Sequence, residues 1–440
     1  MYQRTKIALA LLLLTAPLAA QQELGLNLMH HVWQSNYTNP AIVQPERFVF
    51  AGLGFRNNLV FDGPTYNQIV TRKDGKPVID IERFIGYLEP ENTVRDDLDF
   101  STLNFAFRLG NLTLSAGHAV KYHAFIRYPK TLPQVVWQGN AQFIGETVDL
   151  SNDLQLTGYH ELAFGAAWKM GNLTLGAKGK FLNGIADVTT HSKHRNASLY
   201  TDPDVYQITL NGDYILHTAN SIDYESYKDL NADFNFGSLT LDKFFSRNAG
   251  FAFDLGARLE LGKLDLTASV LDIGAIQWDH NVTNYLALQS YQYDGLDFSQ
   301  ALTGGDVSFG DALDTLEQLF RVEKTGDAYS NSLPRKIYLG ATWQLNDAWR
   351  VGGVFFNENF RGESATAVAV GANVALFKFL DLGATYAVKQ NRSFDNFGLN
   401  LTLALGPFRL FGVTDNVFAL VEPGNSKNFT ARFGAAFLIE

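Results

Sequence analysis

Apolar and polar residues alternate along most of this chain, and short turn sequences interrupt the alternation. The segment Phe251–Leu261 has an apolar residue at every second position, with Asp, Gly, Arg and Glu among the residues between them. This period of two predicts a β-strand with one apolar face and one polar face. Where two such segments flank a tight turn, the pattern predicts a β-hairpin. Six hairpins are expected, with turns at Gly110-Asn111, Gly171-Asn172, Gly262-Lys263, Asn346-Asp347, Phe377-Lys378 and Gly406-Pro407.

Two further alternating segments flank the hairpins, one at about Arg47–Phe61 and one at Asn428–Ile439. Together with the hairpin strands they make about fourteen strands, and bacterial membrane barrels require an even number. The strands are roughly 9 to 11 residues long, which is the length that crosses a bilayer at a tilt. Strands of soluble proteins average about five or six residues. The strand length therefore favours a barrel that crosses a membrane.

The connections between strands alternate between tight turns and four long segments, which are residues 62–100, 123–160, 184–249 and 275–335. Bacterial outer-membrane barrels show the same asymmetry, with short periplasmic turns and long outer loops. A secreted soluble β-protein is the alternative, but it does not need uniformly long strands. We therefore predict an all-β fold, a transmembrane up-and-down antiparallel β-barrel formed by residues 47–440. Both termini would then lie in the periplasm.

The N-terminal residues have the features of a secretory signal. Arg4 and Lys6 precede the apolar run Ile7–Leu14, and small residues follow it. We expect residues 1–20 to be a signal peptide. A membrane anchor is the alternative, and it is disfavoured because the run is too short to span a bilayer. No later apolar run reaches roughly 18 residues, so the sequence predicts no transmembrane helix.

Composition narrows the choice of partners and chemistry. The chain has no cysteine, which excludes disulfides, thiol chemistry and lipid attachment through a cysteine. Its formal net charge is −10, whereas proteins that bind nucleic acid present a basic surface. Nucleic acid is therefore not an expected partner.

Residues on the polar face of the strands would line the lumen of the barrel. A lumen of about fourteen strands is intermediate between filled small barrels and open porins, so it can hold a plug, a ligand or water. Ion pairs between neighbouring strands, such as Arg258 with Asp254 and Glu260, are the favoured interpretation of its charges, and substrate binding is the alternative. The lumen-facing charges expected from the alternation are Arg108, Lys178, Asp254, Arg258, Glu260 and Arg432.

No residue pattern predicts catalysis. The sequence contains no nucleophile elbow, zinc-protease motif or phosphate loop. His30 and His31 are adjacent and would point in different directions, and His191 and His194 fall in a long connection without a nearby carboxylate. The acidic stretch 96–99 is interpreted as a solvated loop. We therefore expect no catalytic residues, no metal site and no cofactor.

Residues 21–46 precede the first strand and lack a strand period. They contain Asn39-Pro40-Ala41, which resembles the Asn-Pro-Ala signature of the FadL-like outer-membrane family. Two further segments, Phe244–Trp278 and Phe411–Val417, resemble an uncharacterised family of Bacteroidota outer-membrane proteins with a FadL-like barrel. Together the three segments extend the resemblance over essentially the whole mature chain.

This resemblance implies a barrel whose N-terminal segment, residues 21–46, folds into the lumen as a hatch that includes Asn39, Pro40 and Ala41. It implies passive transport of small hydrophobic molecules across the outer membrane, with an apolar small molecule as the ligand. The alternative is a non-transporting partner barrel of a secretion or surface-lipoprotein complex, like the type IX secretion component of the superfamily. Outer-membrane lipid and the barrel-assembly machinery are the remaining expected partners.

Overall fold

The structure is a computed structural model, and it describes residues 23–224, 230–232, 248–293, 323–389 and 397–440. The predicted signal peptide, residues 1–20, lies outside the described residues.

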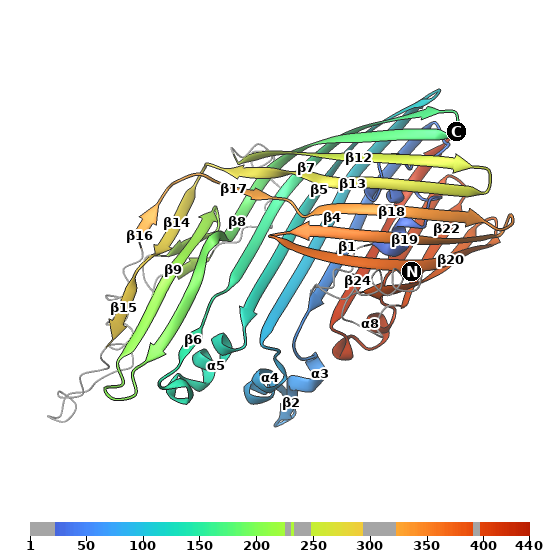
Figure 1. The fold of residues 1–440 in the computed structure, drawn as a ribbon. Helices are drawn as coiled ribbons and strands as arrows, with labels where there is room; N and C mark the ends of the chain where they lie inside the picture. Colours follow the sequence, from blue (N-terminus) through green and yellow to red (C-terminus); the bar gives the residue numbers. More distant parts are fainter. Residues whose placement is uncertain (1–22, 225–229, 233–247, 294–322, 390–396) are drawn as a thin grey trace, which may run out of the picture.

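Fourteen antiparallel strands close into a barrel (Figure 1). Each strand pairs with the next, and the last strand pairs with the first, with Phe48 opposite Ile439, so the barrel has no free edge. The predicted fold class is confirmed. The barrel strands are β1 (Phe48–Phe61), β4 (Glu91–Leu109), β5 (Leu112–Pro129), β7 (Asp153–Met170), β8 (Leu173–Thr201), β12 (Ala249–Leu261), β13 (Leu264–Trp278), β18 (Arg335–Gln344), β19 (Trp349–Phe360), β20 (Glu363–Phe377), β21 (Leu380–Lys389), β22 (Phe397–Leu405), β23 (Phe408–Thr414) and β24 (Asn428–Ile439).

All six predicted hairpins are present, and their turns lie at one end of the barrel, here called the tight-turn end. Gly110, Gly171, Gly262 and Gly406 have φ between 59° and 64° in these turns. Residues with a Cβ adopt such angles only at a cost, which explains glycine at these positions. The turn between β20 and β21 lies one residue later than predicted, because Phe377 still pairs with Leu380.

The opposite end, here called the long-connection end, is uneven. β8 has 29 residues and β4 has 19, whereas β22 has 9 and β23 has 7. The wall of the barrel is therefore taller on the side of β4, β5, β7 and β8 (Figure 1). The acidic stretch 96–99 belongs to β4 and pairs with β1, so its interpretation as a loop was wrong. Pairing with a neighbouring strand, which the local pattern does not reveal, extends β4 back to Glu91.

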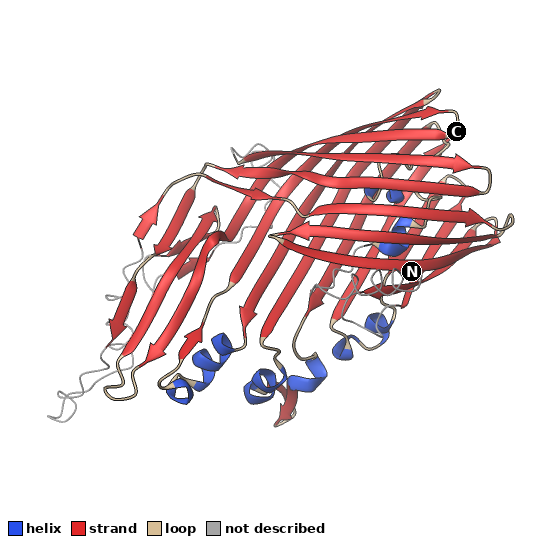
Figure 2. Ribbon diagram, viewed as in Figure 1, coloured by secondary structure: helices blue, strands red, loops and turns tan. Residues whose placement is uncertain are grey.

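Short strands continue the sheet beyond the barrel at the long-connection end (Figures 1 and 2). β9 pairs with β8, β14 and β15 pair with β9, and β17 pairs with β13. These and the other small strands are β2 (Val70–Lys73), β3 (Lys76–Ile79), β6 (Thr147–Asp149), β9 (Ile208–Ala219), β10 (Ile222–Tyr224), β11 (Leu230–Ala232), β14 (Val282–Ala287), β15 (Ser290–Tyr293), β16 (Glu323–Thr325) and β17 (Tyr329–Ser332).

Helices are few and short in the described part of the chain (Figure 2). None of them is long and apolar enough to span a bilayer. They are α2 (Leu24–Asn27), η1 (Trp33–Tyr37), α3 (Tyr66–Ile69), α4 (Ile81–Tyr87), α5 (Thr131–Gln138), η2 (Ala141–Phe143), α8 (Phe418–Val421) and η4 (Pro423–Asn425).

The outer face of the barrel exposes large apolar side chains, whereas polar and charged side chains of the same strands are buried inside. On β12, Phe253 is 56% exposed and Leu255 is 54% exposed, whereas Asp254 between them is 2% exposed. A belt of this kind suits lipid, where a charged side chain costs about 2–4 kcal/mol at the midplane. The belt includes Phe105, Phe164, Trp168, Phe251, Leu255, Leu339, Trp343, Val370, Val388, Leu399 and Phe433.

Residues 23–46, here called the plug, lie inside the barrel (Figure 1). Leu24 and Leu28 pack with Tyr338 and Phe356 of the wall. Trp33 packs against residues of β1 and β24 near the tight-turn end. Apolar side chains of the plug thus pack against apolar side chains of the wall.

Candidate functional site

The predicted hatch residues anchor the plug to the wall. Asn39 is fully buried, and its Nδ2 donates to the carbonyl oxygens of Ala257 and Ala268, both at 3.1 Å. Its Oδ1 accepts from the backbone N–H of Ala41 at 2.8 Å. One amide side chain therefore joins β12, β13 and the plug, which an apolar residue at position 39 could not do.

Two wall glycines make room for this anchor. A Cβ at Gly176 would overlap the backbone of Pro40, and a Cβ at Gly256 would lie 2.8 Å from Pro40 Cδ. Real Cβ atoms do not approach other atoms this closely, so Pro40 can pack against the wall only because residues 176 and 256 are glycines.

The other end of the plug is held by carboxylates and arginines. Asp415, between β23 and β24, accepts from the backbone N–H groups of Leu24 at 3.2 Å and Gly25 at 3.0 Å. Glu23 contacts the guanidinium groups of Arg56 and Arg432, the former at 3.5 Å. These contacts hold the start of the described chain inside the lumen, where the carboxylate of Glu23 is paired with two arginines.

Asp99 completes this ion cluster. It accepts from Arg56 Nη1 at 3.2 Å and from Arg432 Nη2 at 3.0 Å. The Arg432 guanidinium also lies 4.9 Å from the ring centroid of Tyr37 in the plug. Burying a charge is costly unless it is paired, so two arginines and two carboxylates share one site.

The two histidines of the plug have separate partners near the tight-turn end. His30 Nδ1 lies 3.0 Å from Asp265 Oδ2. His31 Nε2 lies 3.0 Å from Thr402 Oγ1, and Arg350 Nη2 lies 2.9 Å from His31 Nδ1. Burial, and then the charge of Arg350, lower the pKa of His31 well below its ordinary value.

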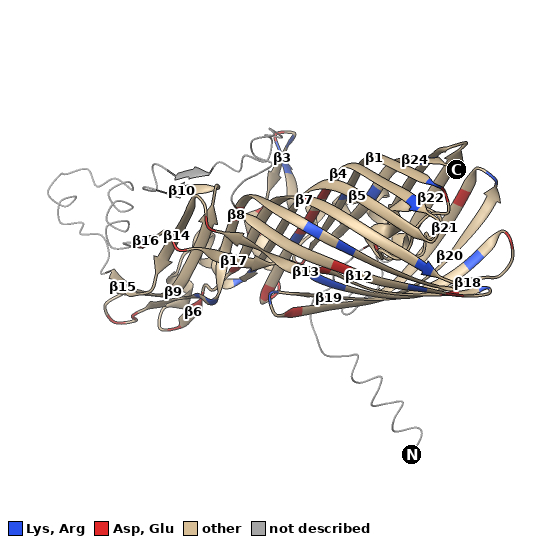
Figure 3. Cartoon of the chain, turned by 90° about the horizontal axis from the view of Figure 1, so that it is seen from above, with Lys and Arg blue, Asp and Glu red and all other residues tan. Residues whose placement is uncertain are grey.

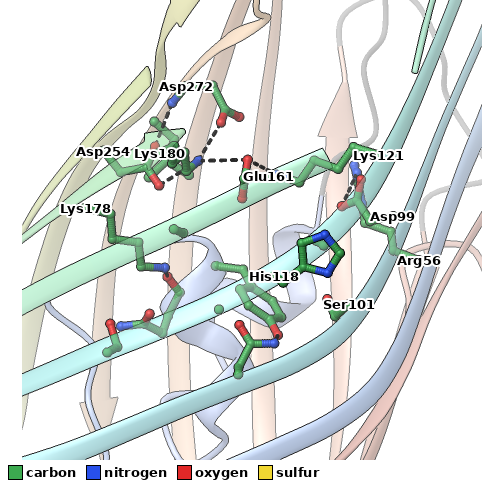
Figure 4. A pocket seen from close by; sticks show the side chains of 18 of the residues that line it. Arg56, Asp99, Ser101, His118, Lys121, Glu161, Lys178, Lys180, Asp254 and Asp272 are labelled. Atoms are coloured by element: carbon green, nitrogen blue, oxygen red, sulfur yellow. Dashed lines mark hydrogen bonds and ion pairs between the residues drawn. The ribbon is translucent and has the colours of Figure 1, made fainter. Parts of the chain in front are cut away.

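A small cavity of about 70 Å³ lies between the plug and the wall, and charged side chains surround it (Figure 4). Lys180 Nζ contacts Asp254 at 2.8 Å and Asp272 at 2.6 Å. Lys121 Nζ contacts Glu161 at 2.7 Å. We call this space the inner cavity. Its lining is a layer of alternating charges, and such a lining holds water or polar groups better than hydrocarbon.

Lys178 differs from its neighbours. Its Nζ donates to the carbonyl oxygen of Asn36 in the plug at 2.7 Å and lies 5.8 Å from the ring centroid of Tyr37. In the described part of the chain it forms no ion pair. It is therefore a cation of the wall that contacts the plug through uncharged groups.

Two further cavities continue the inner cavity toward the long-connection end. A cavity of about 40 Å³ shares Arg56, Asp99 and Lys121 with the inner cavity. A wider one of about 780 Å³, here called the mouth cavity, shares Gln155 and Leu333 with the middle one. Three cavities thus follow one another from the mouth of the barrel to the plug, and neighbouring cavities share lining residues.

The mouth cavity is lined by arginine, histidine and hydroxyl side chains from both sides of the barrel. Arg361, at the tip between β19 and β20, reaches across to β7 and β8. It contacts Asp153 Oδ1 at 2.5 Å, Gln155 Oε1 at 3.2 Å and the carbonyl oxygen of Thr190 at 2.7 Å. One long side chain therefore joins the short side of the barrel to the tall side.

Comparison with known proteins gives a family but no curated relative. The chain matches the family of unknown function DUF5723 over residues 40–415. It belongs to this family. The match confirms the sequence-based expectation of a family without an assigned function. Among curated proteins, none matches the chain.

Several solved structures resemble the chain at low identity. The Ralstonia pickettii toluene transporter TbuX is 9% identical, with a TM-score of 0.46 and coverage of 93% of this chain and 94% of that one. The Pseudomonas putida toluene transporter TodX is 9% identical, with a TM-score of 0.42 and coverage of 96% and 98%. The translocator domain of the autotransporter NalP from Neisseria meningitidis is 10% identical, with a TM-score of 0.32 and coverage of 93% and 96%. Values this low say nothing about what the DUF5723 chain binds.

The architecture defines the cellular location in coarse terms. A closed barrel satisfies every strand pairing internally, and this barrel presents an apolar belt outward. The DUF5723 chain is therefore an outer-membrane β-barrel.

The structure separates the charges that the sequence grouped as lumen-facing. Lys178, Asp254 and Arg432 line the inner cavity. Arg258 and Glu260 lie on one strand near the tight-turn end, where their side chains contact each other at 3.4 Å, and Arg258 also contacts Asp265 of the neighbouring strand β13 at 2.7 Å. Charged residues occur along the length of the barrel strands (Figure 3).

One of these predictions needs correction. Asp254 does not pair with Arg258, because Asp254 lies opposite Lys178 in the β8–β12 register and its carboxylate meets Lys180. Arg108 lies at the tight-turn end, where its exposed side chain donates to the carbonyl oxygen of Pro45 in the plug.

Several charges of the inner cavity were not predicted from the sequence, among them Arg56, Asp99, Lys121 and Asp272. Asp99 and Asp97 occupy alternate positions of β4, which is the signal that could have placed them on an inward face. Glu23 had no such signal, because it precedes the strands and reaches Arg56 only through the fold of the plug.

Proposed function

We propose that this chain is a plugged outer-membrane channel through which small molecules pass passively, with the plug as its gate. The series of three cavities from the mouth to the plug is the observation that carries this proposal. In this proposal the tight-turn end faces the periplasm and the long-connection end faces outward, as in other bacterial barrels.

The plug must move for a solute to pass. The inner and middle cavities hold only about 70 and 40 Å³, whereas ligand pockets usually hold about 300 Å³ or more. The polar contacts of the plug are exchangeable, because each buried hydrogen bond contributes only about 0.5–1.5 kcal/mol net. Release of Glu23, Leu24 and Gly25 from the wall would widen the inner cavity, because Glu23 and its partner Arg56 line it.

The lining of the path favours polar solutes over the hydrophobic ones that the sequence resemblance implies. A hydrocarbon in the inner cavity would bury Lys180, Asp272 and Glu161 against apolar surface without forming a hydrogen bond. A small polar solute keeps these groups solvated or hydrogen-bonded. We therefore propose sugars, amino acids or small organic acids as the solute class, and hydrophobic solutes are the competing outcome of the test.

A reversible lock tests the plug. The chain has no cysteine, so introduced cysteines have no competing partners. A Cβ at Gly25 would lie 2.9 Å from Val413 Cγ2 on β23, which is within disulfide reach. Gly25→Cys combined with Val413→Cys should fasten the plug to the wall under oxidising conditions and free it on reduction.

The measurement is solute influx into proteoliposomes by osmotic swelling with arabinose, glycine and lactate. We expect influx to fall in the oxidised double variant, to recover on reduction and to exceed that of the wild type when residues 23–42 are deleted. Heat-modifiable gel mobility shows whether each barrel has folded. Equal influx for all four folded forms contradicts the proposal. If an apolar fluorescent dye passes and these solutes do not, the channel transports hydrophobic molecules instead of polar ones.

A second candidate function is docking of a protein partner. The strands that extend the sheet beyond the barrel, β9, β14 and β15, favour it, because passage through the lumen does not need them (Figure 1). Native mass spectrometry from mild detergent tests this function. A stoichiometric surface lipoprotein or secretion component bound to a barrel without channel activity supports docking over transport.

A further inference from the structure

We infer that the mouth cavity is a binding site for a small hydroxylated organic anion, such as an acidic sugar. This inference does not rest on passage through the lumen, because none of the described residues that line the mouth cavity belongs to the plug.

Size and position suit a small ligand. The mouth cavity holds about 780 Å³, within the roughly 300–1,000 Å³ that ligand sites occupy. Its walls come from β7, β8, β9, the β17–β18 connection and the tip between β19 and β20. A ligand there would contact both the tall and the short side of the barrel.

The lining of the mouth cavity has more cations than anions, because Arg195, Arg335 and Arg361 line it with one carboxylate, that of Asp272. Beside the cavity, Arg195 and Arg361 share the buried carboxylate of Asp153 with Arg127. A guanidinium has five N–H donors, so one carboxylate cannot satisfy three of them. Glu363 adds one further acceptor for Arg127. The arginines therefore have donors to spare.

Two arginines of the lining, Arg195 and Arg335, have N–H donors available for an anion. Arg195 has no side-chain partner other than Asp153 in the described residues, and its side chain is 31% exposed. Arg335 lines the same cavity and forms no side-chain hydrogen bond or ion pair in that part of the chain. A carboxylate or phosphate bound between them would form charge-assisted hydrogen bonds, which are stronger than neutral ones.

His217 supplies an acceptor for a hydroxyl group. The amide nitrogen of Asn284 donates to Thr325 and to the carbonyl oxygen of Asp327, so its Oδ1 must accept from His217 Nδ1 at 2.8 Å. His217 Nε2 is then a lone-pair acceptor. Burial lowers the pKa of His217, which keeps the ring neutral.

The ring of His217 also stacks on Tyr329, with centroids 4.5 Å apart, so this wall is flat and aromatic. Thr189, Ser192 and Ser330 add hydroxyl groups to the lining. A flat wall, neutral acceptors and hydroxyl groups beside two arginines match a ring that carries both hydroxyl groups and an acid. A bare inorganic anion would use only the arginines.

Isothermal titration of the detergent-solubilised full chain with D-glucuronate tests this inference, with D-glucose and acetate as matched probes. We expect glucuronate to bind roughly tenfold or more tightly than either, because each probe lacks half of the contacts. Arg195→Gln and Arg335→Gln should each weaken glucuronate binding roughly tenfold. Arg72→Gln, which makes the same charge change on the remote β2–β3 hairpin, should leave it unchanged.

Arg335→Gln keeps the test meaningful even if Arg195→Gln disturbs the fold, because among the described residues the side chain of Arg335 has no hydrogen bond or ion pair to lose. Absence of glucuronate binding, equal binding of glucose, or an equal loss with Arg72→Gln overturns the inference. Equal binding of acetate overturns its hydroxyl part. The oxidised and reduced plug lock should bind glucuronate equally, so a failure of the channel proposal is distinguishable from a failure of this one.

Discussion

At the scale of single residues, buried polar side chains decide where the plug lies. Asn39 joins two strands of the wall, Asp415 accepts from the start of α2, and Glu23 contacts two arginines. Each of these groups would be costly to bury alone, so the position of the plug is defined by where the wall offers a partner. The apolar contacts of Leu24 and Trp33 add affinity but less specificity.

His31 makes the plug sensitive to pH. Its pKa is lowered while the plug is docked, and it returns to about 6.5 when the plug is released. Below that pH the released state binds more protons, so docking weakens as the pH falls and is strongest above it. The groups that face His31 are His30, Asp381, Arg350 and Arg409.

We therefore expect channel opening in planar bilayers to increase between pH 7.5 and pH 5 in the wild type. His31→Gln should remove most of this increase, while the His30–Asp265 contact near it stays unchanged. An increase of the same size in His31→Gln assigns the pH response to other groups.

At the scale of elements, the fit between plug and strands depends on glycine. Gly176 and Gly179 both lie on β8, but only a Cβ at Gly176 would overlap Pro40, whereas a Cβ at Gly179 meets nothing within 4 Å. The two glycines face opposite sides of one strand, as alternation requires. The same substitution at each position therefore separates packing of the plug from any effect on the strand.

Gly176→Ala should displace the plug at its anchor. We expect faster arabinose influx into proteoliposomes and a barrel destabilised by about 1–3 kcal/mol, the usual effect of overpacking. Gly179→Ala should change neither influx nor the urea midpoint. If Gly176→Ala behaves like Gly179→Ala, the plug does not sit tightly against β8.

Patterning within elements was readable from the sequence, but the lengths of elements were not. Alternation predicted β24 to the residue, because every second position from Phe429 to Ile439 is apolar. The extension of β4 to Glu91 was not predicted, because Asp97 and Asp99 on its inward face look like a solvated loop until β1 and β5 are placed beside them. Strand ends are set by neighbours rather than by local preference.

At the scale of the whole molecule, the barrel separates two environments. Its outer belt faces lipid, while the lumen holds charges and a polar path. The uneven wall adds a mouth cavity where the tall side of the barrel faces β18, β19 and β20, which are shorter than β4, β5, β7 and β8 (Figure 1). Location in the membrane and the chemistry of the lumen therefore have separate structural origins.

The belt can be tested directly. Leu255→Arg introduces a charge near the middle of the outer face of β12 and should destabilise the barrel in a lipid bilayer by about 2–4 kcal/mol. Val78→Arg, on the exposed β3 strand outside the barrel, should have little effect. Urea unfolding from bilayers measures both. Equal destabilisation, or none for Leu255→Arg, would mean that this face does not meet lipid.

The sequence by itself determined the class of fold, the strand count and the location of the hairpins. It could do so because alternation and turn preferences are local, so the sequence of each strand alone shows which of its faces is apolar and which is polar. The closed barrel agrees with what that local pattern predicts.

Only the tertiary structure decided which charges meet. Glu23, Arg56 and Arg432 come from the plug, the first strand and the last strand, and barrel closure alone brings them together. In the mouth cavity, Arg195 likewise comes from β8 and Arg361 from the tip between β19 and β20, on the other side of the wall. Such contacts depend on strand register and on the path of the plug, which no local pattern encodes, because a shift of one residue turns every side chain to the other face.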